Sequence, residues 1–381
     1  MKLLMITGLG SAKDLASGKR GAFYNTLEEF HKYWERIDVI APNVKCQMSN
    51  VKCLFGNVYI HISPWPLIFH PFWFLKKGLE IYKEQKFDLM TVHDYPPFYN
   101  GIGAWMLWRR IKVPYILELM HIPGYPRAGN FKEVLYKNIM RWFIKYDVKR
   151  AKKIRIINKI QAPKFLKKAG VSEEKCVYIP AFYIDLDIFS PKDTEKKYDL
   201  AFTARLEKNK GITELLRAVK LLIKSRPEDY FLIKLLIIGS GPLKKELTEF
   251  VEQNGLENNV FFSGWLATSD DVAKAYSSAR IFVNPSYNEG GPRVVLEAMA
   301  CGLPVITTRV GLMPDIIKDG ENGLFTDWTA EDMADKISRL LKNKEFQVKF
   351  VAAGLELVKR FEKKEAIKNY AEQLKSLISN P

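Results

Sequence analysis

The sequence predicts an α/β protein in which mostly parallel, doubly wound β-sheets form two domains. Short runs of β-branched and aromatic residues alternate with stretches of helical periodicity along the whole chain. A strand, a glycine-containing loop and a helix follow one another at the N-terminus and again near residue 290. The chain has 381 residues, which is long for a single hydrophobic core.

The first half of the chain opens with a strand at Lys2–Gly8, a glycine-rich loop at Leu9–Gly21 and a helix at Ala22–Tyr33. The spacing G-x-G-x-x-G is absent, so this opening does not predict a dinucleotide site. Five further short strands are expected at Arg36–Ala41, Val58–Ile62, Leu89–His93, Tyr115–Leu119 and Ile154–Ile157.

The alternation starts again at Tyr198, after a predicted linker at Pro180–Lys197. Strands are expected at Asp199–Thr203, Phe231–Ile238, Val260–Ser263 and Arg280–Asn284. Helices are expected at Ile212–Lys224, Leu243–Asn254, Arg293–Ala300, Asp332–Leu341, Lys344–Arg360 and Glu362–Ser379.

The stretch Asn288–Pro304 has the strongest chemical signature, N-E-G-G-P-R-V-V-L-E-A-M-A-C-G-L-P. Gly290 and Gly291 break the preceding strand, and Pro292 suits the first turn of a helix. The first N–H groups of a helix lack internal partners and lie at the positive end of its dipole. Glycines let an anion approach the backbone closely, so this loop predicts phosphate binding.

Two carboxylates flank this group of backbone amides. Glu289 precedes the glycines, and Glu297 follows eight residues later, inside the predicted helix. Carboxylates accept hydrogen bonds from hydroxyl groups, so the pair could bracket a diphosphate that carries a polyol at each end. The alternative is a strand, a loop and a helix with two surface glutamates and no ligand.

The composition of the chain indicates the cellular compartment in which the protein works. The four cysteines are scattered without C-x-x-C spacing, which argues against zinc or a disulfide framework and suits a reducing compartment. The apolar run Lys2–Thr7 is too short for a signal peptide, and no window supplies the roughly 20 apolar residues of a spanning helix. We therefore expect a cytoplasmic protein.

Charge is distributed unevenly between the two halves. Residues 1–190 contain 30 Lys and Arg against 16 Asp and Glu, a net charge of +14, whereas residues 191–381 carry only +2. A basic half joined to a nearly neutral half suggests that the first half faces an anionic partner. A nucleic acid, a phospholipid surface and a phosphorylated acceptor would each fit.

The basic residues are densest at Tyr136–Lys168, which holds twelve Lys or Arg and one acid, Asp147. Ile139, Trp142, Phe143 and Tyr146 follow helical spacing and form an apolar stripe with basic flanks. We expect a peripheral contact with an anionic membrane, at the inner face of that membrane. The alternative is a solvated basic face, and nucleic acid is disfavoured because no nucleic-acid-binding module is recognisable.

A second aromatic stretch lies at Ile62–Leu75, where three prolines interrupt a run of tryptophans and phenylalanines before two lysines. The prolines and the short length exclude a spanning helix. Exposed aromatic side chains beside lysines would suit a membrane interface. The alternative is a loop that packs its aromatic residues on the domain.

Three motifs carry a resemblance to a known family. Besides E-G-G-P-R-V-V-L-E at Glu289–Glu297, the chain has A-R-L-E-K-N-K-G at Ala204–Gly211, with Ala204 where the family usually has glycine, and I-I-G-S-G-P at Ile237–Pro242. Their order and spacing resemble the retaining nucleotide-sugar glycosyltransferases of family 4, which have the GT-B fold. The resemblance implies two Rossmann-like domains facing across a cleft, with a last helix that crosses back. It places an N-terminal domain at 1–187 with the crossing helix 362–381, and a nucleotide-sugar domain at 188–361.

The resemblance also implies roles for individual residues. Arg205 and Lys210 would hold the diphosphate of the donor, and His121 would lie in the cleft near the reacting sugar. Glu289 would bind the donor sugar and Glu297 the ribose. The donor-binding set implied by the resemblance further includes Gly18, Gly21, Gly290, Gly291, Pro292 and Arg293, with Lys19 and Arg20 as nearby cations.

The expected function is transfer of a hexose from a UDP- or GDP-sugar to an acceptor glycan or a lipid-linked acceptor, in a polysaccharide or glycoconjugate pathway. No cofactor and no metal are expected to be required. One alternative is a sugar-nucleotide epimerase or a phosphorylase of the same fold, which would need other acids or a pyridoxal-phosphate lysine. The other is a basic nucleic-acid-binding protein in which the glutamate pair is vestigial.

Overall fold

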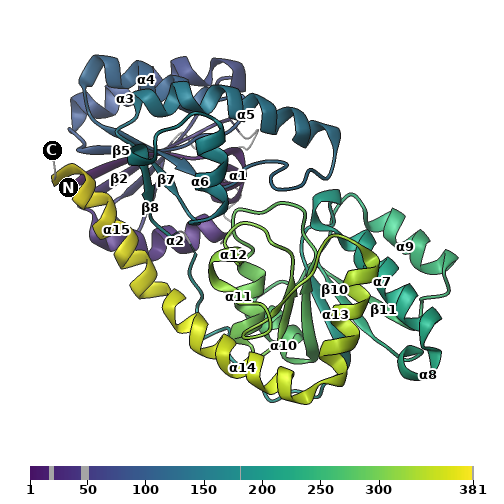
Figure 1. The fold of residues 1–381 in the computed structure, drawn as a ribbon. Coiled ribbons are helices and arrows are strands. Elements are labelled where there is room, and N and C mark those ends of the chain that lie inside the picture. Colours follow the sequence, from purple (N-terminus) through teal and green to yellow (C-terminus); the bar gives the residue numbers. More distant parts are fainter. Residues whose placement is uncertain (17–20, 44–50, 181, 380–381) are drawn as a thin grey trace. The chain divides into compact units, whose positions relative to one another are not determined.

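The computed structural model describes residues 1–16, 21–43, 51–180 and 182–379, and the chain folds as two compact units (Figure 1). The first unit comprises Met1–Met120, Asn138–Ala181 and Lys364–Pro381, and the second comprises His121–Lys137 and Phe182–Lys363. In this division by contacts, His121–Lys137 and residues 182–187, which precede the expected boundary between 187 and 188, group with the second unit. Each unit is built on one sheet of mostly parallel strands, and the predicted α/β class is confirmed.

The sheet of the first unit has the strand order β3-β4-β2-β1-β5-β6-β7-β8, and β3 alone of these pairs antiparallel with its neighbour. Its strands are β1 (Lys2–Ile6), β2 (Arg36–Ala41), β3 (Val51–Leu54), β4 (Val58–Ile62), β5 (Leu89–His93), β6 (Tyr115–Leu119), β7 (Lys153–Ile156) and β8 (Cys176–Tyr178). Its helices are α1 (Leu9–Ala16), α2 (Ala22–Phe30), α3 (His70–Glu84), α4 (Tyr99–Ile111), the later part of α5 (Phe131–Arg150), α6 (Gln161–Lys168) and α15 (Lys363–Ser379).

One expectation for this unit is wrong. The segment Leu9–Gly21 was predicted as a loop, but its first part is the helix α1. The reason is that Ala12 and Leu15, three residues apart on one helical face, are both buried. Gly18, Lys19 and Arg20, to which the resemblance gave a role, lie outside the described residues.

The second unit has a six-stranded parallel sheet in the order β11-β10-β9-β12-β13-β14. Its strands are β9 (Tyr198–Thr203), β10 (Leu235–Ile238), β11 (Val260–Gly264), β12 (Ala279–Asn284), β13 (Val305–Thr307) and β14 (Leu324–Phe325). Its helices are α7 (Ile212–Ser225), α8 (Pro227–Tyr230), α9 (Lys244–Gln253), α10 (Ser269–Ser277), α11 (Arg293–Ala300), α12 (Met313–Ile316), α13 (Ala330–Lys342) and α14 (Lys344–Val358).

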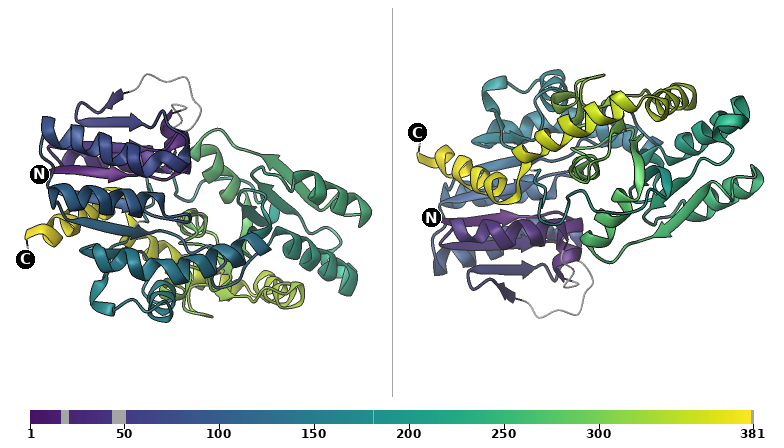
Figure 2. Two further views of the ribbon diagram at one scale, coloured as in Figure 1. Left: turned by 90° about the horizontal axis from the view of Figure 1, so that it is seen from above. Right: turned by 90° about the horizontal axis from the view of Figure 1, so that it is seen from below.

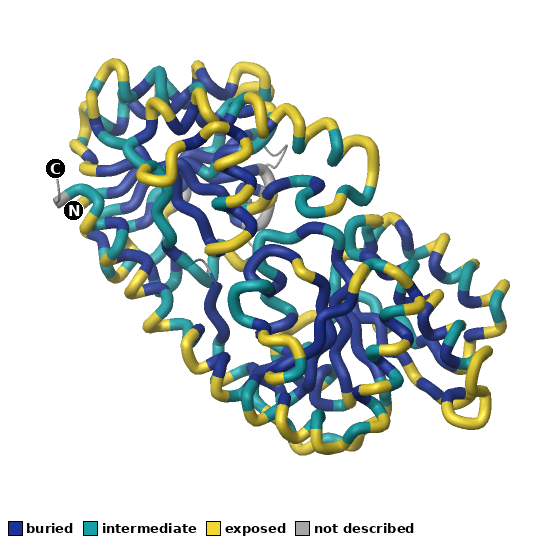
Figure 3. Tube along the Cα trace, in the orientation of Figure 1, coloured by how far each residue is buried: buried dark blue, intermediate teal, exposed yellow. Residues whose placement is uncertain are grey.

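The strand predicted at Phe231–Ile238 is shorter than expected. It begins only at Leu235, because Phe231 and Leu232 follow the short helix α8 and expose most of their surface. Only the second half of this apolar run therefore forms a strand. The residues that do form β10 are buried, as are the central strands of both sheets in Figure 3.

Local side-chain chemistry explains where several helices of the second unit begin. The Thr268 hydroxyl accepts a hydrogen bond from the Asp271 N–H, and the Asp271 carboxylate accepts one from the Thr268 N–H. Together the two hydrogen bonds form a capping box at the start of α10. Thr329 caps α13 in the same way by accepting from the Asp332 N–H. These polar residues satisfy N–H groups that have no partner inside the helix.

The last helix, α15, belongs to the first unit from Lys364 onward, as the resemblance implied (Figures 1 and 2). The Tyr370 ring stacks on Phe30 with 4.7 Å between centroids, and its hydroxyl donates a 2.8 Å hydrogen bond to the carboxylate of Glu118. The guanidinium of Arg155 lies 3.7 Å from the same ring and also pairs with Glu118. This buried cluster anchors α15 to the sheet of the first unit.

The two aromatic stretches divide between the core and the surface. In the segment Ile62–Leu75, Trp73 and Phe74 are buried in α3, whereas Trp65, Phe69 and Phe72 are exposed. Part of this stretch therefore packs on the domain, as the alternative expected, and part of it is exposed. Among the described residues, no helix combines the length and the apolarity that a membrane crossing requires.

The apolar stripe predicted on α5 is mostly exposed. Ile139, Trp142 and Tyr146 expose 38%, 63% and 41% of their surfaces. Phe143 is half-buried and stacks on Phe98 with 4.5 Å between ring centroids. The stripe is therefore not the face with which α5 packs on its sheet.

Candidate active site

The predicted site residues of the second unit meet at one edge of its sheet. β9 and β12 are parallel neighbours, but the chain leaves β9 towards β10 and leaves β12 towards β13, on the opposite side. Such a reversal of strand order opens a crevice at the carboxyl ends, where α/β proteins bind ligands. Arg205 and Lys210 follow β9, and Glu289 follows β12, so the topology itself brings these loops together.

Lys210 and Glu289 form the central contact of the site. The Lys210 ammonium lies 2.5 Å from Oε1 of Glu289, and both side chains are largely buried. The same carboxylate oxygen accepts a 3.1 Å hydrogen bond from the Ser286 hydroxyl. A cation and a carboxylate that are 79 residues apart in sequence are thus held as a pair beside the start of α11.

Hydrogen bonds to Ser286 from neighbouring polar side chains fix the loop that carries Glu289. The backbone carbonyl of Ser286 accepts hydrogen bonds from the Thr308 hydroxyl at 2.6 Å and from the indole N–H of Trp328 at 2.9 Å. The Ser286 hydroxyl also lies 3.0 Å from the side-chain oxygen of Asn284, at the end of β12, so its single hydrogen is shared between Asn284 and Glu289. These contacts preorganise the loop, so its position does not depend on the Lys210–Glu289 pair alone.

Arg205 has a different environment. Its side chain is 70% exposed, and its guanidinium lies 3.2 Å from the carboxylate of Glu207. Exposed ion pairs of this kind contribute little to stability and are exchanged easily. The ion pair with Glu207 therefore leaves the guanidinium at the surface.

His121 is joined to the same loop by Asn288. The side-chain oxygen of Asn288 lies 3.0 Å from Nε2 of His121. The Asn288 amide donates to the carbonyl of Arg127 at 2.9 Å and to the carboxylate of Glu133 at 2.8 Å. Because both amide hydrogens are used in this way, the Asn288 oxygen faces His121, and Nε2 of His121 carries the hydrogen.

The protonation state of His121 follows from these neighbours. Although part of its surface is exposed, the packed protein around the ring desolvates it and lowers the pKa of His121, an effect that Glu289 and Asn288 partly oppose. The imidazole is therefore neutral at neutral pH. With Nε2 as donor, Nδ1 is an acceptor that can take a hydrogen bond from a hydroxyl group.

The glycines of the loop are required by close packing. A Cβ atom on Gly291 would lie 2.0 Å from the ring of Phe182, so a side chain there would displace that ring. A Cβ atom on Gly311, which has φ of +53°, would lie 2.3 Å from the carbonyl oxygen of Gly290. The first helical residue after this loop is Arg293, and Pro292 occupies the N-cap position.

Glu297 lies one turn inside α11 and is half-buried. Burial raises the pKa of Glu297, whereas the Arg293 guanidinium and a hydrogen bond from Tyr276 lower it. The Tyr276 hydroxyl lies 3.5 Å from Oε2 of Glu297, and Arg293 stacks on the ring of Tyr183 with 4.4 Å to its centroid. The carboxylate therefore has few fixed partners and can accept hydrogen bonds from hydroxyl groups.

The structure brings together most of the predicted site residues, but not all of them. His121, Lys210, Glu289, Gly290 and Gly291 are connected through the contacts around Asn288 and Ser286. Gly21 belongs to the first unit, where it precedes α2, and Gly18 lies outside the described residues.

Two polar residues that orient the site were not identified from the sequence. Asn288 is completely buried and links His121 to the loop. The carboxylate of Glu133 accepts hydrogen bonds from the Asn288 side-chain amide and from the Gly129 N–H. Asn288 stands beside Glu289 in the motif, so its position was a usable signal. Glu133 is 155 residues away from its partner, and no local pattern marks it.

No group of three or more His, Cys, Asp and Glu side chains with the geometry of a metal site occurs in the part of the chain that the structure describes.

Comparison with known proteins identifies the family. The sequence model of glycosyl transferases group 1 matches residues 184–357. The chain is 30% identical over 306 residues to the uncharacterized glycosyltransferase MJ1059 of Methanocaldococcus jannaschii. This alignment covers 75% of this chain and 71% of that protein.

Two solved structures share the fold. Sucrose-phosphate synthase from Thermosynechococcus elongatus superposes with a TM-score of 0.82 at 18% identity and covers 100% of both chains. Anabaena HepE in complex with UDP-glucose superposes with a TM-score of 0.74 at 18% identity and covers 99% of this chain and 100% of that one. The predicted GT-B fold is thereby confirmed. The chain belongs to the group 1 glycosyltransferases and is a glycosyltransferase.

Proposed function

We propose that this enzyme transfers a hexose from a UDP- or GDP-sugar to an acceptor and retains the configuration at the anomeric carbon, as family 4 glycosyltransferases do. The observation that carries the proposal is the Lys210–Glu289 pair beside the N-terminus of α11, at the strand-order reversal of the second unit. The structural relative HepE, which holds UDP-glucose, supports a nucleotide-sugar donor.

The chemical demand on the site is stabilisation of a leaving nucleoside diphosphate. Negative charge grows on the diphosphate as the glycosidic bond breaks, and preorganised cations and amides lower the energy of that state. In this proposal Lys210 and the amides of Gly290 and Gly291 contact the phosphates. Arg205 joins them by leaving Glu207, which costs little because that ion pair is exposed.

Glu289 and His121 are proposed to bind the sugar. Glu289 would keep Lys210 as one partner and accept a hydrogen bond from a sugar hydroxyl with its second oxygen. Neutral His121 would offer Nδ1 as an acceptor, with Asn288 holding the ring through Nε2. In this arrangement no side chain has to act as a covalent nucleophile, which agrees with attack of the acceptor from the side on which the diphosphate departs.

Glu297 is proposed to bind the ribose hydroxyls of the donor. It lies one turn into α11, beyond the amides that would hold the phosphates, and a charged acceptor there can take two hydroxyl hydrogen bonds. Arg293 lies on the same helix face and partly opposes the rise in the pKa of Glu297 that burial causes. Pro292 and Arg293 would complete the donor contacts of the loop.

The acceptor is proposed to be a glycan or a lipid-linked molecule reached at the inner face of a membrane, in a polysaccharide or glycoconjugate pathway. The support is the net charge of +14 on residues 1–190 together with the exposed Ile139, Trp142 and Tyr146 of α5. Aromatic side chains at a membrane interface place apolar surface in the lipid boundary, while lysines attract anionic head groups.

Calorimetric titration with UDP, GDP and ADP tests the donor site. We expect one diphosphate to bind preferentially, and Glu297→Ala to weaken that binding by about 1–3 kcal/mol through loss of charged hydrogen bonds. Glu321→Ala is a matched control, because it removes an exposed carboxylate of the same unit that pairs only at the surface with Lys318. Equal affinity in the Glu297 variant and the wild type would contradict the ribose assignment.

Retention is tested by a separate measurement. The anomeric configuration of the product, read by NMR coupling constants during the first turnovers, should match that of the donor. An inverted product would contradict the family 4 mechanism and leave the donor site intact. Tight, salt-sensitive RNA binding without any donor turnover would contradict the transferase assignment of the site as a whole.

A further inference from the structure

A cavity of about 500 Å³ opens on the second unit between α7 and the beginning of α13, two helices that pack against each other (Figure 1). Its lining comes from residues 214–224 of α7, from residues 328–331 at the start of α13, and from Arg127, whose segment groups with this unit. The volume lies in the range of small-molecule sites, roughly 300–1,000 Å³. None of these lining residues belongs to the set proposed to bind the donor.

The lining contains more cations than carboxylates. Arg217 pairs with Glu214 at 2.6 Å on α7. Lys220 and Lys224 follow at helical spacing, are exposed, and make no ion pair and no hydrogen bond with any residue that the structure describes. Glu331 is the second acid of the lining and is exposed. The two lysine ammonium groups are therefore available to an anion.

Two further acids stand next to the lining in sequence and have partners of their own. Asp327 accepts hydrogen bonds from the N–H and the hydroxyl of Thr329, at 2.8 and 2.6 Å. Asp332 accepts one from the Asp327 N–H at 2.9 Å and pairs with Lys336 at 3.3 Å. Four cations and two carboxylates line the cavity itself, so the lining keeps an excess of positive charge.

The wall of the cavity is held in place by the loop that carries Glu289. The indole N–H of Trp328 donates to the carbonyl of Ser286 at 2.9 Å. The Arg127 guanidinium lies 4.6 Å from the ring centroid of Tyr287 and 5.6 Å from that of Trp328. Burial raises the pKa of Tyr287, and Arg127 opposes that rise, as expected for a cation close to the phenol. The cavity thus has a preorganised wall of aromatic rings and a guanidinium.

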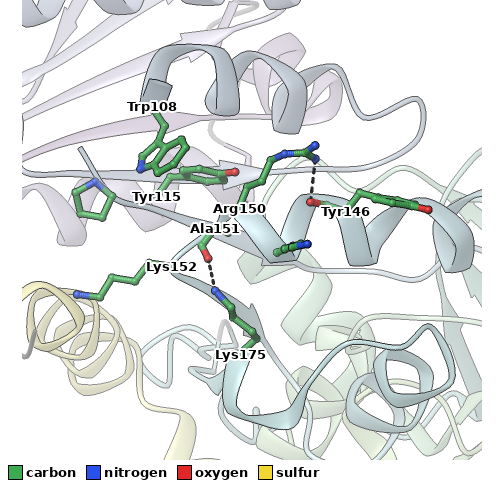
Figure 4. Close-up of a pocket in the computed structure, with 9 residues that line it drawn as sticks. Trp108, Tyr115, Tyr146, Arg150, Ala151, Lys152 and Lys175 are labelled. Carbon is green, nitrogen blue, oxygen red and sulfur yellow. Dashed lines mark hydrogen bonds between the residues drawn. The ribbon is translucent and has the colours of Figure 1, made fainter. Parts of the chain in front are cut away.

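A basic cavity of about 580 Å³ in the first unit differs from this one (Figure 4). It lies at the amino ends of β6, β7 and β8, and its basic lining residues are Lys149, Arg150, Lys152 and Lys175. The Lys175 ammonium and the Arg150 guanidinium each donate to a backbone carbonyl, at 2.8 and 3.1 Å. Arg150 also interacts with the buried Asp147, and Lys152 has an interaction of its own. We assign no ligand to this cavity.

We propose that the cavity between α7 and α13 binds a hexose monophosphate. The phosphate would contact Lys220 and Lys224, because the excess positive charge of the lining matches the charge of about −1.5 to −2 on a phosphomonoester at neutral pH. Glu331 would accept hydrogen bonds from sugar hydroxyl groups, and Trp328 would contact the apolar side of the sugar ring. This second site is independent of the donor site in the proposed function.

The test is calorimetric titration of the full chain with glucose 6-phosphate and with mannose 6-phosphate. The pocket variant is Lys220→Ala with Lys224→Ala. The control is Lys234→Ala with Lys344→Ala, which removes the same charge from exposed positions of the same unit outside the cavity. Inorganic phosphate and glucose are titrated separately, and circular dichroism checks that all variants are folded.

We expect the wild type to bind at least one of the two hexose phosphates saturably. The pocket variant should bind it roughly tenfold or more weakly, because charge-assisted hydrogen bonds to the phosphate are lost. The control pair should bind within about twofold of the wild type, since exposed charges outside the cavity are screened by salt. Inorganic phosphate and glucose should each bind more weakly than the hexose phosphate, because each makes only part of the contacts.

Several results would overturn the proposal. They are the absence of saturable binding for both hexose phosphates, an equal loss in the two lysine pairs, and no loss in the pocket variant. Inorganic phosphate that binds as tightly as the hexose phosphate would also overturn it, because the cavity would then hold an adventitious ion only.

A last variant separates this cavity from the donor site. Lys210→Ala should leave hexose phosphate binding unchanged, and its loss there would place the phosphate in the donor site and contradict the proposal. The affinity for UDP or GDP should be the same in the pocket variant and the wild type. A failure of the donor site would therefore be recognised separately from a failure of this cavity.

Discussion

Two helices, α5 and α7, carry apolar residues at helical spacing and use them differently. In α7, Ile212, Leu215, Leu216, Val219 and Leu222 all enter the core of the second unit. In α5, a buried row of Met140, Ile144 and Val148 packs on the sheet, while the aromatic row of Ile139, Trp142 and Tyr146 is exposed. The comparison teaches that apolar periodicity predicts a helix, but not which apolar face the fold will bury.

The physical reason is that α5 has two apolar faces and only one sheet to cover. α7 has a single apolar face, opposite the exposed Arg217, Lys220 and Lys224, so only one orientation buries it. In α5, the row of unbranched and branched aliphatic side chains is buried, and the row that carries the larger aromatic side chains is exposed to solvent. In the proposed function, this exposed aromatic face is the part of α5 that contacts the membrane.

The largest effect is expected from the core of α7. Leu216→Ala should lower the free energy of unfolding by about 2–5 kcal/mol, because Leu216 is fully buried and the substitution leaves a cavity. Trp142→Ala is the partner measurement and should change it by less than about 0.5 kcal/mol, as expected for a surface site. Chemical denaturation of both variants checks this. A comparable loss of unfolding free energy in Trp142→Ala would contradict the conclusion that the aromatic row of α5 does not contribute to the core.

A second prediction concerns the buried carboxyl of α5. Burial raises the pKa of Asp147 from 3.8 to about 9, with Asp94 as the next cause. The folded state therefore binds a proton that the unfolded chain releases between those pH values, and stability falls as pH rises through that window. Asp147→Asn should remove the part of this dependence that Asp147 contributes and stabilise the protein by about 1–3 kcal/mol at pH 8, with little effect near pH 4; the dependence caused by Asp94, whose pKa burial raises to about 6, remains.

Thermal or denaturant unfolding of Asp147→Asn across pH 4–9 measures this effect. The Asn amide can donate to Asp94, so the hydrogen bond between the two side chains is retained in the variant. Asp335→Asn is the control, because Asp335 is exposed on α13. A variant that is less stable than the wild type at pH 8 would show that Asp147 is ionised and paired in the folded protein.

The smallest effect is expected at the exposed stripe. Trp142→Ser should weaken binding to anionic vesicles by about 1–2 kcal/mol, because the indole would no longer be buried in the lipid boundary. Its stability in solution should be unchanged. Trp265→Ser removes a tryptophan that is 75% exposed in the second unit and should leave vesicle binding as it is. Equal losses in both variants would mean that the stripe on α5 has no special role.

Much of the candidate site could be predicted from local sequence. The strand, loop and helix around Glu289 are encoded by neighbouring residues: buried β12, two glycines and Pro292, then helix formers. Lys210 could be assigned because it belongs to a motif of its own after β9. Their 2.5 Å contact could not be derived locally, because it depends on β9 and β12 becoming neighbours across 79 residues.

The errors have a common cause. At Leu9–Ala16 the glycines suggested a loop, but burial of Ala12 and Leu15 stabilises a helix. At Phe231–Ile238 the apolar run suggested one strand, but its first residues are exposed after α8. In both segments local preference was overruled by what the rest of the unit covers.

The sequence by itself determined the α/β class, most of the helices and strands, and the glycine loop with its two glutamates, because these depend on residues close together in the chain. Only the tertiary structure decided that Asn288 orients His121, that the aromatic face of α5 is exposed, and that four cations meet at the amino ends of β6, β7 and β8. The physical reason is that burial and charge clustering are properties of surfaces, and surfaces are assembled from segments that lie far apart in sequence.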